Sequence, residues 1–118
     1  MLDVQAALES AGVPGYRGAF RPTEEIPDTP YCYCAYTLSR APIWPQDDQN
    51  QGTRIRAFLH LFSTSDPQWA QALIRTAMLG EGFSLLREEE GYVPEAEDYE
   101  VFSEWEGLSM IPIDRRLR

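Results

Sequence analysis

The stretch that decides the fold is TRIRAFLHLFSTSDPQWAQALIRTAMLG, residues 53–80. Over residues 53–63 the side chains alternate between two sets, the period of two that a pleated β-strand requires. One set is apolar and the other mixes aromatic and basic residues: Ile55, Ala57, Leu59 and Leu61 against Arg56, Phe58, His60 and Phe62. We therefore expect a central strand with one face on a hydrophobic core.

A helix is predicted to follow this strand almost directly. The Asp66 carboxylate can accept from the free N–H groups of a first turn, Pro67 suits the first helical position, and Gly80 favours a stop. Apolar residues recur in between with helical spacing, and we expect them to face the sheet: Trp69, Ala70, Leu73, Ile74, Ala77 and Met78. The residues expected to face solvent are Gln68, Gln71, Arg75 and Thr76. One core should unite Trp69, Leu73 and Ala77 with Leu59, Leu61 and Trp105.

The rest of the chain predicts one more helix and further strands. The helix covers residues 1–11 and ends at Gly12, and strands cover residues 15–20, 31–38, 83–89 and 99–106. Proline-rich or polar segments predict loops over 21–30 and 39–52, a turn over 91–97, and an extended C-terminal arm over 108–118. We expect one α+β domain over residues 1–107, with a single, mostly antiparallel sheet of four to five strands and two helices packed on one face.

Charge is distributed unevenly along the 118 residues. The chain has 19 acidic and 10 basic residues, all of the latter arginine, and a formal net charge of -9. Residues 81–106 are strongly acidic and contain Arg87 as their only base, whereas residues 114–118 are net basic. This balance argues against general affinity for free nucleic acid, which needs cationic neutralisation of phosphates. No apolar run approaches the ~20 residues of a membrane span, and no signal-peptide pattern opens the sequence, so we expect the protein to stay where it is made.

The residues give no sign of a catalytic site, a cofactor site or a metal site. His60 is the only histidine, and the acidic runs 47–48 and 88–90 have nothing nearby that would raise the pKa of one carboxyl selectively. Cys32 and Cys34 lie two apart on a predicted strand, too far apart for an easy disulfide, so we expect reduced and packed thiols rather than half of a metal site. We therefore expect a protein that acts through its surfaces and not as an enzyme.

Several apolar residues lie where a lone domain would leave them exposed. Phe58, Phe62 and Phe102 are predicted to form a strip on the sheet face away from the helices, and we expect a neighbouring subunit to cover it. Other interface candidates lie in the long loop and the C-terminal arm, which we expect to be ordered by partners: Ile43, Trp44, Met110, Ile111, Ile113, Arg115 and Arg116. Folding of Trp44 back onto the chain's own core is the alternative for that residue.

Three stretches of the sequence resemble a known family. They are LFSTSDP at residues 61–67, YEVFSEWE at 99–106 and PDTPY at 27–31, together with the opening helix that ends in Gly-Val-Pro. In this combination they resemble the small tail-completion proteins, or tail terminators, of long-tailed bacteriophages, over residues 1–107. Two positions depart from that pattern, since Phe58 stands where the family usually has a polar residue and Ser103 where it has an aromatic one.

The resemblance implies a structural virion protein at the head–tail interface, made in the cytoplasm of a bacterial host. A tail terminator forms a homo-oligomeric, hexameric ring that caps the tail tube and joins it to the head–tail connector or its stopper protein. It carries no catalysis and takes no cofactor, and DNA passes through its lumen only as cargo. Three alternatives remain: a head-completion or stopper protein of the same connector, a small acidic inhibitor or immunity-type binding protein, and a small-molecule enzyme.

Overall fold

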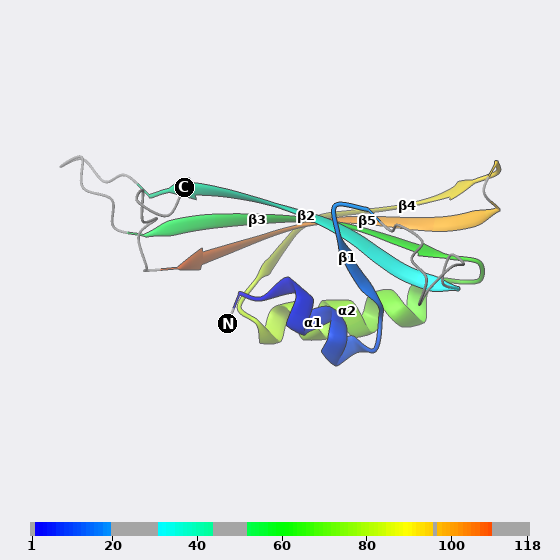
Figure 1. Ribbon diagram of the computed structural model, residues 1–118, viewed down its shortest axis with the longest axis horizontal. Coiled ribbons are helices and arrows are strands. Elements are labelled where there is room, and N and C mark those ends of the chain that lie inside the picture. The colour runs from blue at the N-terminus through cyan, green and yellow to red at the C-terminus, as the bar shows by residue number, and fades with distance from the viewer. Residues whose placement is uncertain (1, 20–30, 44–51, 96, 110–118) are drawn as a thin grey trace, which may run out of the picture.

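The computed structural model describes residues 2–19, 31–43, 52–95 and 97–109. Seven elements follow one another, and their bounds are α1 (Val4–Ala11), β1 (Gly15–Arg17), β2 (Cys32–Pro42), β3 (Thr53–Ser63), α2 (Gln68–Gly80), β4 (Ser84–Val93) and β5 (Asp98–Ser109). The five strands form one sheet in the order β1-β2-β3-β5-β4. Both helices lie on the same side of this sheet (Figure 1). The predicted α+β fold, with one mostly antiparallel sheet and two helices on one face, is confirmed.

Strand β3 is the centre of the sheet, as its alternating pattern predicts. It pairs antiparallel with β2 on one side and with β5 on the other, so that Ala57 lies between Leu38 and Trp105. Ile55, Ala57, Leu59 and Leu61 are buried on the helix side, whereas Phe58, His60 and Phe62 are only partly buried on the other. Strand β1 is the exception to the antiparallel arrangement, because it pairs parallel with β2.

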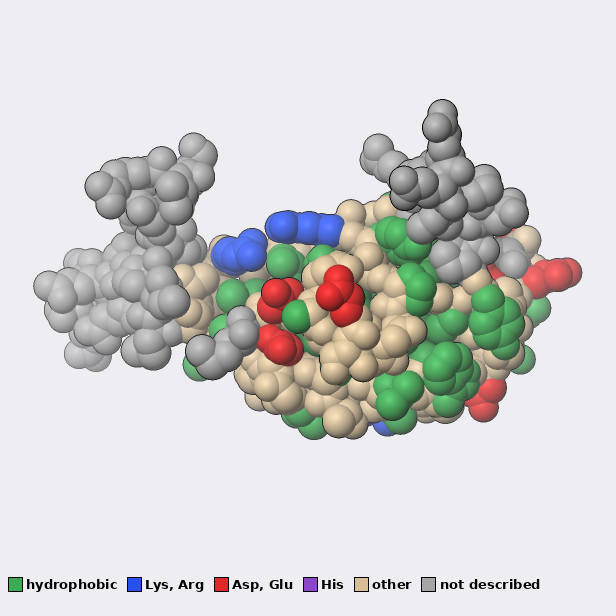
Figure 2. All heavy atoms as spheres, turned by 60° about the horizontal axis from the view of Figure 1, so that its bottom comes forward, with side chains coloured by type: hydrophobic (Ala, Val, Ile, Leu, Met, Phe, Trp, Pro, Cys, Tyr) green, Lys and Arg blue, Asp and Glu red, His purple; other side chains and the backbone are tan. Residues whose placement is uncertain are grey.

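Helix α2 has a different face toward the sheet from the one expected. The Asp66 carboxylate does accept from the N–H of Gln68, at 3.0 Å, as the start signal predicts. The buried residues of the helix, however, are Ala70, Gln71, Ile74 and Met78. Trp69 and Leu73 are 51% and 47% exposed, so their assignment to the core is wrong, as is that of Gln71 to solvent. Figure 2 shows hydrophobic side chains on the surface of this helix layer.

Polar contacts between α2 and β4 account for this rotation. Gln71 Nε2 donates to Glu88 Oε1 at 2.7 Å, and Arg75 donates to both carboxylate oxygens of Glu88, at 2.9 Å and 2.6 Å. Nearer the start of the helix, Gln68 Nε2 donates to Glu90 at 2.8 Å. These side chains hold one polar edge of the helix against β4, and the apolar residues Trp69 and Leu73 therefore turn outward.

The contact between Arg75 and Glu88 predicts a dependence of stability on pH. Hydrogen bonds from Arg75 hold the pKa of Glu88 below its usual value. Ionised Glu88 therefore stabilises the fold above the unfolded-state pKa of about 4.3, and this contribution is lost as the pH falls through the lower folded-state value. We expect Glu88→Gln to lower the free energy of unfolding at pH 7 by less than about 1 kcal/mol, because the pair is partly exposed.

The measurement is urea unfolding of the parent and of Glu88→Gln between neutral and acidic pH. The difference between the two proteins should shrink as the pH falls below about 4. Glu89→Gln, which removes the same charge from a side chain that is 65% exposed, serves as the control. A difference between parent and Glu88→Gln that stayed constant down to acidic pH would contradict the assignment.

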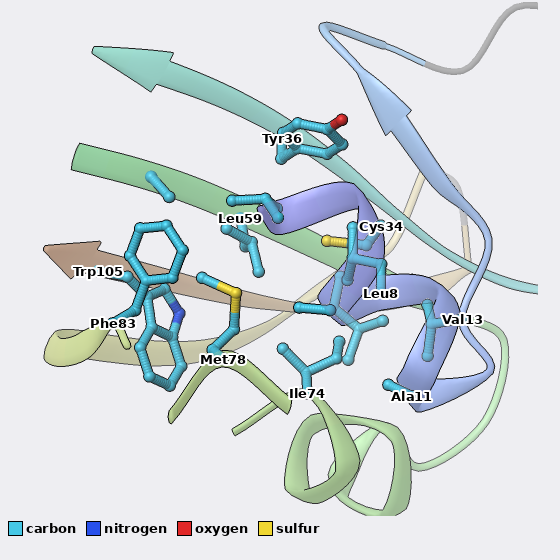
Figure 3. Packing of buried hydrophobic residues seen from close by; sticks show 14 of the residues in the cluster. Leu8, Ala11, Val13, Cys34, Tyr36, Leu59, Ile74, Met78, Phe83 and Trp105 are labelled. Carbon is cyan, nitrogen blue, oxygen red and sulfur yellow. The ribbon is translucent and has the colours of Figure 1, made fainter. Parts of the chain in front are cut away.

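The buried side chains form one core between the sheet and the helices. Figure 3 shows Trp105 and Phe83 beside Met78 at one end, and Leu8, Ala11 and Val13 of the N-terminal segment at the other. Leu59, Leu61 and Trp105 belong to this core, as predicted, and Ala77 packs against it. Cys32 and Cys34 are free and buried, which confirms the expectation of packed thiols.

Leu2, just ahead of α1, contacts both the segment after α2 and strand β5. Asp3 Oδ1 accepts from the N–H of Ala6 at the start of α1, and Gly12 ends it with a left-handed φ of 74°. Leu2 N–H donates to the carbonyl of Glu81 at 2.8 Å, just beyond α2. A Cβ added at Gly107 would come within 2.4 Å of Leu2 Cδ2, so the N-terminal segment lies directly against β5.

Three strands are longer than predicted. Strand β2 continues to Pro42, where a loop was expected from residue 39, β4 continues to Val93, and β5 continues to Ser109, which pairs with Thr53. The predicted loop therefore begins later, with Ile43 N–H donating to the carbonyl of Gly52 at 3.0 Å, and the first residues of the predicted arm, Leu108 and Ser109, belong to the sheet. The central strands extend beyond the helix layer, and neither described helix packs against them there (Figure 1).

Candidate functional site

The candidate site is the open face, meaning the face of the sheet opposite the two helices. Pairing between strands places one residue of each strand in register across it, for example Ala35, His60, Phe102 and Glu89. The described part of the chain provides no helix or strand that covers this face (Figure 1). Ala35 is buried on this face, whereas Phe58, His60, Phe62 and Phe102 keep part of their surface exposed.

An aromatic row crosses the open face from one edge strand to the other. It consists of Tyr16 on β1, Tyr33 on β2, Phe62 and His60 on β3, and Phe102 on β5, and it ends at Arg87 on β4. The rings of Tyr33 and Phe62 stack with centroids 5.2 Å apart, and those of His60 and Phe102 are 5.0 Å apart. The Arg87 guanidinium lies 5.0 Å from the centre of the Phe102 ring. These distances fall within the attractive range for ring pairs and for a cation over a ring.

Ion pairs lie beside this row on the same face. Arg56 pairs with Glu104 at 3.2 Å and with Glu106 at 3.5 Å, and Arg54 pairs with Glu106 at 3.2 Å. On the other side of Phe102, the Nδ1 atom of His60 is 2.8 Å from Glu100. Glu100, Glu104 and Glu106 of β5 thus each face an arginine or histidine side chain of β3. The arginines neutralise part of the negative charge, and the aromatic rings lie between charged groups.

The structure brings together the three phenylalanines that the sequence singled out. Phe58, Phe62 and Phe102 all lie on the open face, and each is partly buried by its neighbours. Ile43 follows the end of β2 and is half-buried. The other candidates lie outside the described residues: Trp44, Met110, Ile111, Ile113, Arg115 and Arg116.

Sequence reasoning missed two members of the row and one exposed patch. Tyr33 joins the row because β2 pairs antiparallel with β3, which sets it opposite Phe62, and Tyr16 joins it because β1 pairs parallel with β2. Neither pairing has a local signal in the sequence. The exposed patch comprises Trp69, Leu73 and Leu79 on α2, of which Leu79 is 60% exposed. Leu73 lines a shallow groove between α1 and α2 together with Ala7, Ala11 and Ala77.

The described residues offer little for covalent or metal chemistry. Burial raises the pKa of both the Cys32 and the Cys34 thiol, which keeps them protonated and poorly nucleophilic. Within the described ranges, no three side chains of histidine, cysteine, aspartate or glutamate come together as metal ligands. Burial and the nearby Asp98 raise the pKa of Tyr33, so its hydroxyl remains a neutral hydrogen-bonding group on the open face. The arrangement favours contact with another surface.

Among the described residues, neither helix is long and apolar enough to cross a lipid bilayer. No protein-family model matches the chain, and no curated protein matches its sequence.

Proposed function

We propose that this protein is a structural virion protein, a tail terminator that forms a ring on the tail tube of a long-tailed bacteriophage and joins it to the head–tail connector. The proposal rests on the resemblance of residues 27–31, 61–67 and 99–106 to tail-completion proteins and on the open face of the sheet. In this role the chain is not an enzyme and needs no cofactor. Its partners are further copies of itself, the tail tube protein and the connector, and DNA passes through the ring.

The observation that carries the proposal is the aromatic row on the open face. A single sheet with helices on one side leaves its other side to solvent or to a partner. Here that side carries Phe58, Phe62 and Phe102 together with Tyr16 and Tyr33. Burial of these rings by a neighbouring subunit would remove apolar surface from water and so stabilise the contact. The flanking ion pairs would fix the relative orientation of the two subunits and add to the contact area.

The experiment is to measure the native mass of the purified protein and to image it by negative stain, alone and with tail tube protein. A tail terminator forms a closed ring, six-membered if it follows the resemblance, or binds to tube ends. A head-completion or stopper protein, the alternative in the same assembly, forms a ring that binds the connector and not the tube. A chain that stays monomeric and ignores tube ends would refute both.

Phe58→Asp is expected to prevent ring formation while the protein remains folded. Phe58 is only partly buried, and a carboxylate at this position would face Glu104 across the β3–β5 pair, so a covering subunit would meet a buried, unpaired charge. Sedimentation should show subunits in place of rings, and circular dichroism should show the parent fold. Trp69→Asp places the same charge on a half-exposed residue of α2 and is the control that should still assemble. Normal rings from Phe58→Asp would show that the open face is not the interface.

A second candidate is a small acidic inhibitor that covers a basic partner. One observation favours it: much of the negative charge lies on β4 and β5, with Glu88, Glu89 and Glu90 in succession on an edge strand. Electrostatic steering by such a surface would give a fast, salt-dependent association with a single basic protein. A monomer or dimer in the native mass measurement, with one tight basic partner, would favour this candidate over the ring.

A further inference from the structure

The inference concerns two arginines that have no ionic partner. Most arginines of the described ranges pair with a glutamate, namely Arg54, Arg56, Arg75 and Arg87. The two others, Arg17 of β1 and Arg40 of β2, are exposed and make no ion pair with any carboxylate of those ranges. Both guanidinium groups can therefore bind an anionic group from another molecule.

The two arginines line one hollow, which we call the basic hollow. Its volume is about 420 Å³, and its lining also includes Asp3, Gln5 and Tyr36. Arg17 is in register with Tyr36, and Arg40 lies four residues further along β2, so both are on the helix side of the sheet. Four residues along one strand and one strand across place their Cα atoms about 14 Å apart. A ligand that engages both guanidinium groups therefore needs two anionic groups some distance apart.

The other polar groups leave the basic hollow positive. Asp3 is the one carboxylate among its lining residues, and its Oδ1 atom already accepts from the N–H of Ala6 at 3.0 Å as the cap of α1. The Tyr36 hydroxyl donates to Gln5 Oε1 at 2.9 Å, which leaves the amide nitrogen of Gln5 as a further donor. Two guanidinium groups against one capping carboxylate give a positive net charge, on a chain whose formal net charge is -9. The basic hollow therefore favours an acidic ligand.

The chain carries two matching carboxylates on the turn between β4 and β5. Glu95 and Glu97 are both exposed on this turn, which we call the acidic tip, and neither pairs with an arginine of the described ranges. The turn lies at one end of the long axis of the molecule, beyond both helices (Figure 1). Cα atoms two residues apart are at most about 7 Å from each other. With the long side chains of glutamate and arginine, two such carboxylates can contact two guanidinium groups at once.

We propose that the acidic tip of one copy of the chain binds in the basic hollow of a second copy. Hydrogen bonds between guanidinium and carboxylate groups are charge-assisted and can be bidentate, which fixes the orientation of the two copies. Exposed ion pairs are individually weak. The contact is therefore weak between two isolated copies and gains strength where several copies are held together.

The chain's own acidic tip cannot reach its own basic hollow. Register across the sheet aligns Arg40 with Gly107 of β5 and Arg17 with Ser103 of β5. Strand β5 begins at Asp98, nine residues before Gly107 and five before Ser103. From the spacings along and between strands, the two arginines lie about 30 Å and about 20 Å from that end of β5. Neither distance can be spanned by one arginine and one glutamate side chain, so the occupant is a second copy.

Such a contact is heterologous, since the tip of one copy meets the hollow of the next. Repeated contacts of this kind close into a ring when the rotation between copies allows it and otherwise extend into a chain. The inference goes beyond the proposed function, because it requires only a second copy and uses surfaces other than the open face.

The test traps the contact as a disulfide between two full-length variants. Gln5→Cys places a thiol at the basic hollow, and Pro94→Cys places one on the acidic tip, while all four charged residues stay in place. The native Cys32 and Cys34 are buried and react poorly. Both variants also carry Phe58→Asp, so that contact through the open face does not bring the copies together. Under mild oxidation, non-reducing gels should show the mixed dimer forming faster than either homodimer.

Charge reversal gives the decisive comparison. Adding R17E and R40E to the Gln5→Cys protein should slow formation of the mixed dimer at least about tenfold, because two attractions become two repulsions. Adding E95R and E97R to the Pro94→Cys protein should then restore the rate, because the same two pairs form with their signs exchanged.

The matched control adds two negative charges elsewhere on the helices, with S10E on α1 and T76E on α2, where both residues are exposed. This control should leave the rate of mixed dimer formation unchanged. Mixed dimers that form no faster than homodimers, or a rate indifferent to R17E and R40E, would refute the inference, as would failure of E95R and E97R to restore the rate. Failure of the parent protein to form rings would refute only the proposed function, because every protein in this assay already lacks the open-face contact.

Discussion

Trp105→Ala should lower the free energy of unfolding by about 3–5 kcal/mol, the usual cost of truncating a large aromatic residue in a core. Trp105 is fully buried and pairs across the sheet with Ala57 and Leu85. It lies beside Phe83 and Met78 (Figure 3), and truncation would leave a cavity between the sheet and α2. Its indole N–H donates to Ser103 Oγ at 2.9 Å, so the loss would include a satisfied buried hydrogen bond.

The matched control is Trp69→Ala, the same substitution at a residue that is 51% exposed. We expect it to cost less than about 1 kcal/mol, because most of the removed surface is already in water and little cavity is left. Chemical denaturation of the two variants under one set of conditions gives the comparison. Equal costs at the two positions would mean that the orientation of α2 is wrong.

Gly107→Val should destabilise the protein by about 1–3 kcal/mol, as overfilling of a packed core does. A Cβ at this position would lie 2.4 Å from Leu2 Cδ2 and within 3.1 Å and 3.2 Å of two Phe83 ring atoms. The leucine tip can move aside, but the Phe83 ring is buried and packs against Trp105 (Figure 3). The branched valine would therefore push either the N-terminal segment or the ring out of place.

Gly91→Val separates this crowding from the general effect of valine in a strand. Gly91 lies on β4, and a Cβ there meets nothing within 4 Å, so we expect a neutral or slightly stabilising change. Thermal or chemical unfolding of both variants measures the difference. If Gly107→Val were as stable as Gly91→Val, Leu2 would not lie against β5 as described.

The sequence predicts those parts of the fold that are determined by a local residue pattern. The alternation in residues 53–63 specifies the two faces of β3, and Asp66 with Pro67 specifies where α2 begins, since both signals are local. The orientation of α2 is different. Trp69 and Leu73 fit a helical stripe as well as Ala70 and Ile74 do, and the choice depends on Glu88 of β4, which binds Gln71 and Arg75 across the fold.

The candidate site could be predicted only in part for the same reason. Phe58, Phe62 and Phe102 could be grouped because each alternates with buried residues on its own strand. The extension of the row to Tyr16 depends on the parallel pairing of β1 with β2, in which the N–H of Cys34 donates to the carbonyl of Pro14 and the N–H of Gly18 to that of Tyr36. Likewise, Pro42 and the polar residues beyond it predict a loop from residue 39, whereas pairing with β3 keeps residues 39–42 in the sheet.

The contact of Leu2 with Gly107 and Glu81 bears on how the protein folds during synthesis. Strand β3 can pair with β5 only after β5 has left the ribosome. Leu2, ahead of α1, can contact Gly107 of β5 only from the same point onward. Until then the backbone N–H and C=O groups on one edge of β3 are unpaired and can bind other nascent chains. Contacts so distant in sequence also form slowly. The segment ahead of α1 is made before β5 and therefore reaches its final contact with Gly107 only after β5 has been synthesised.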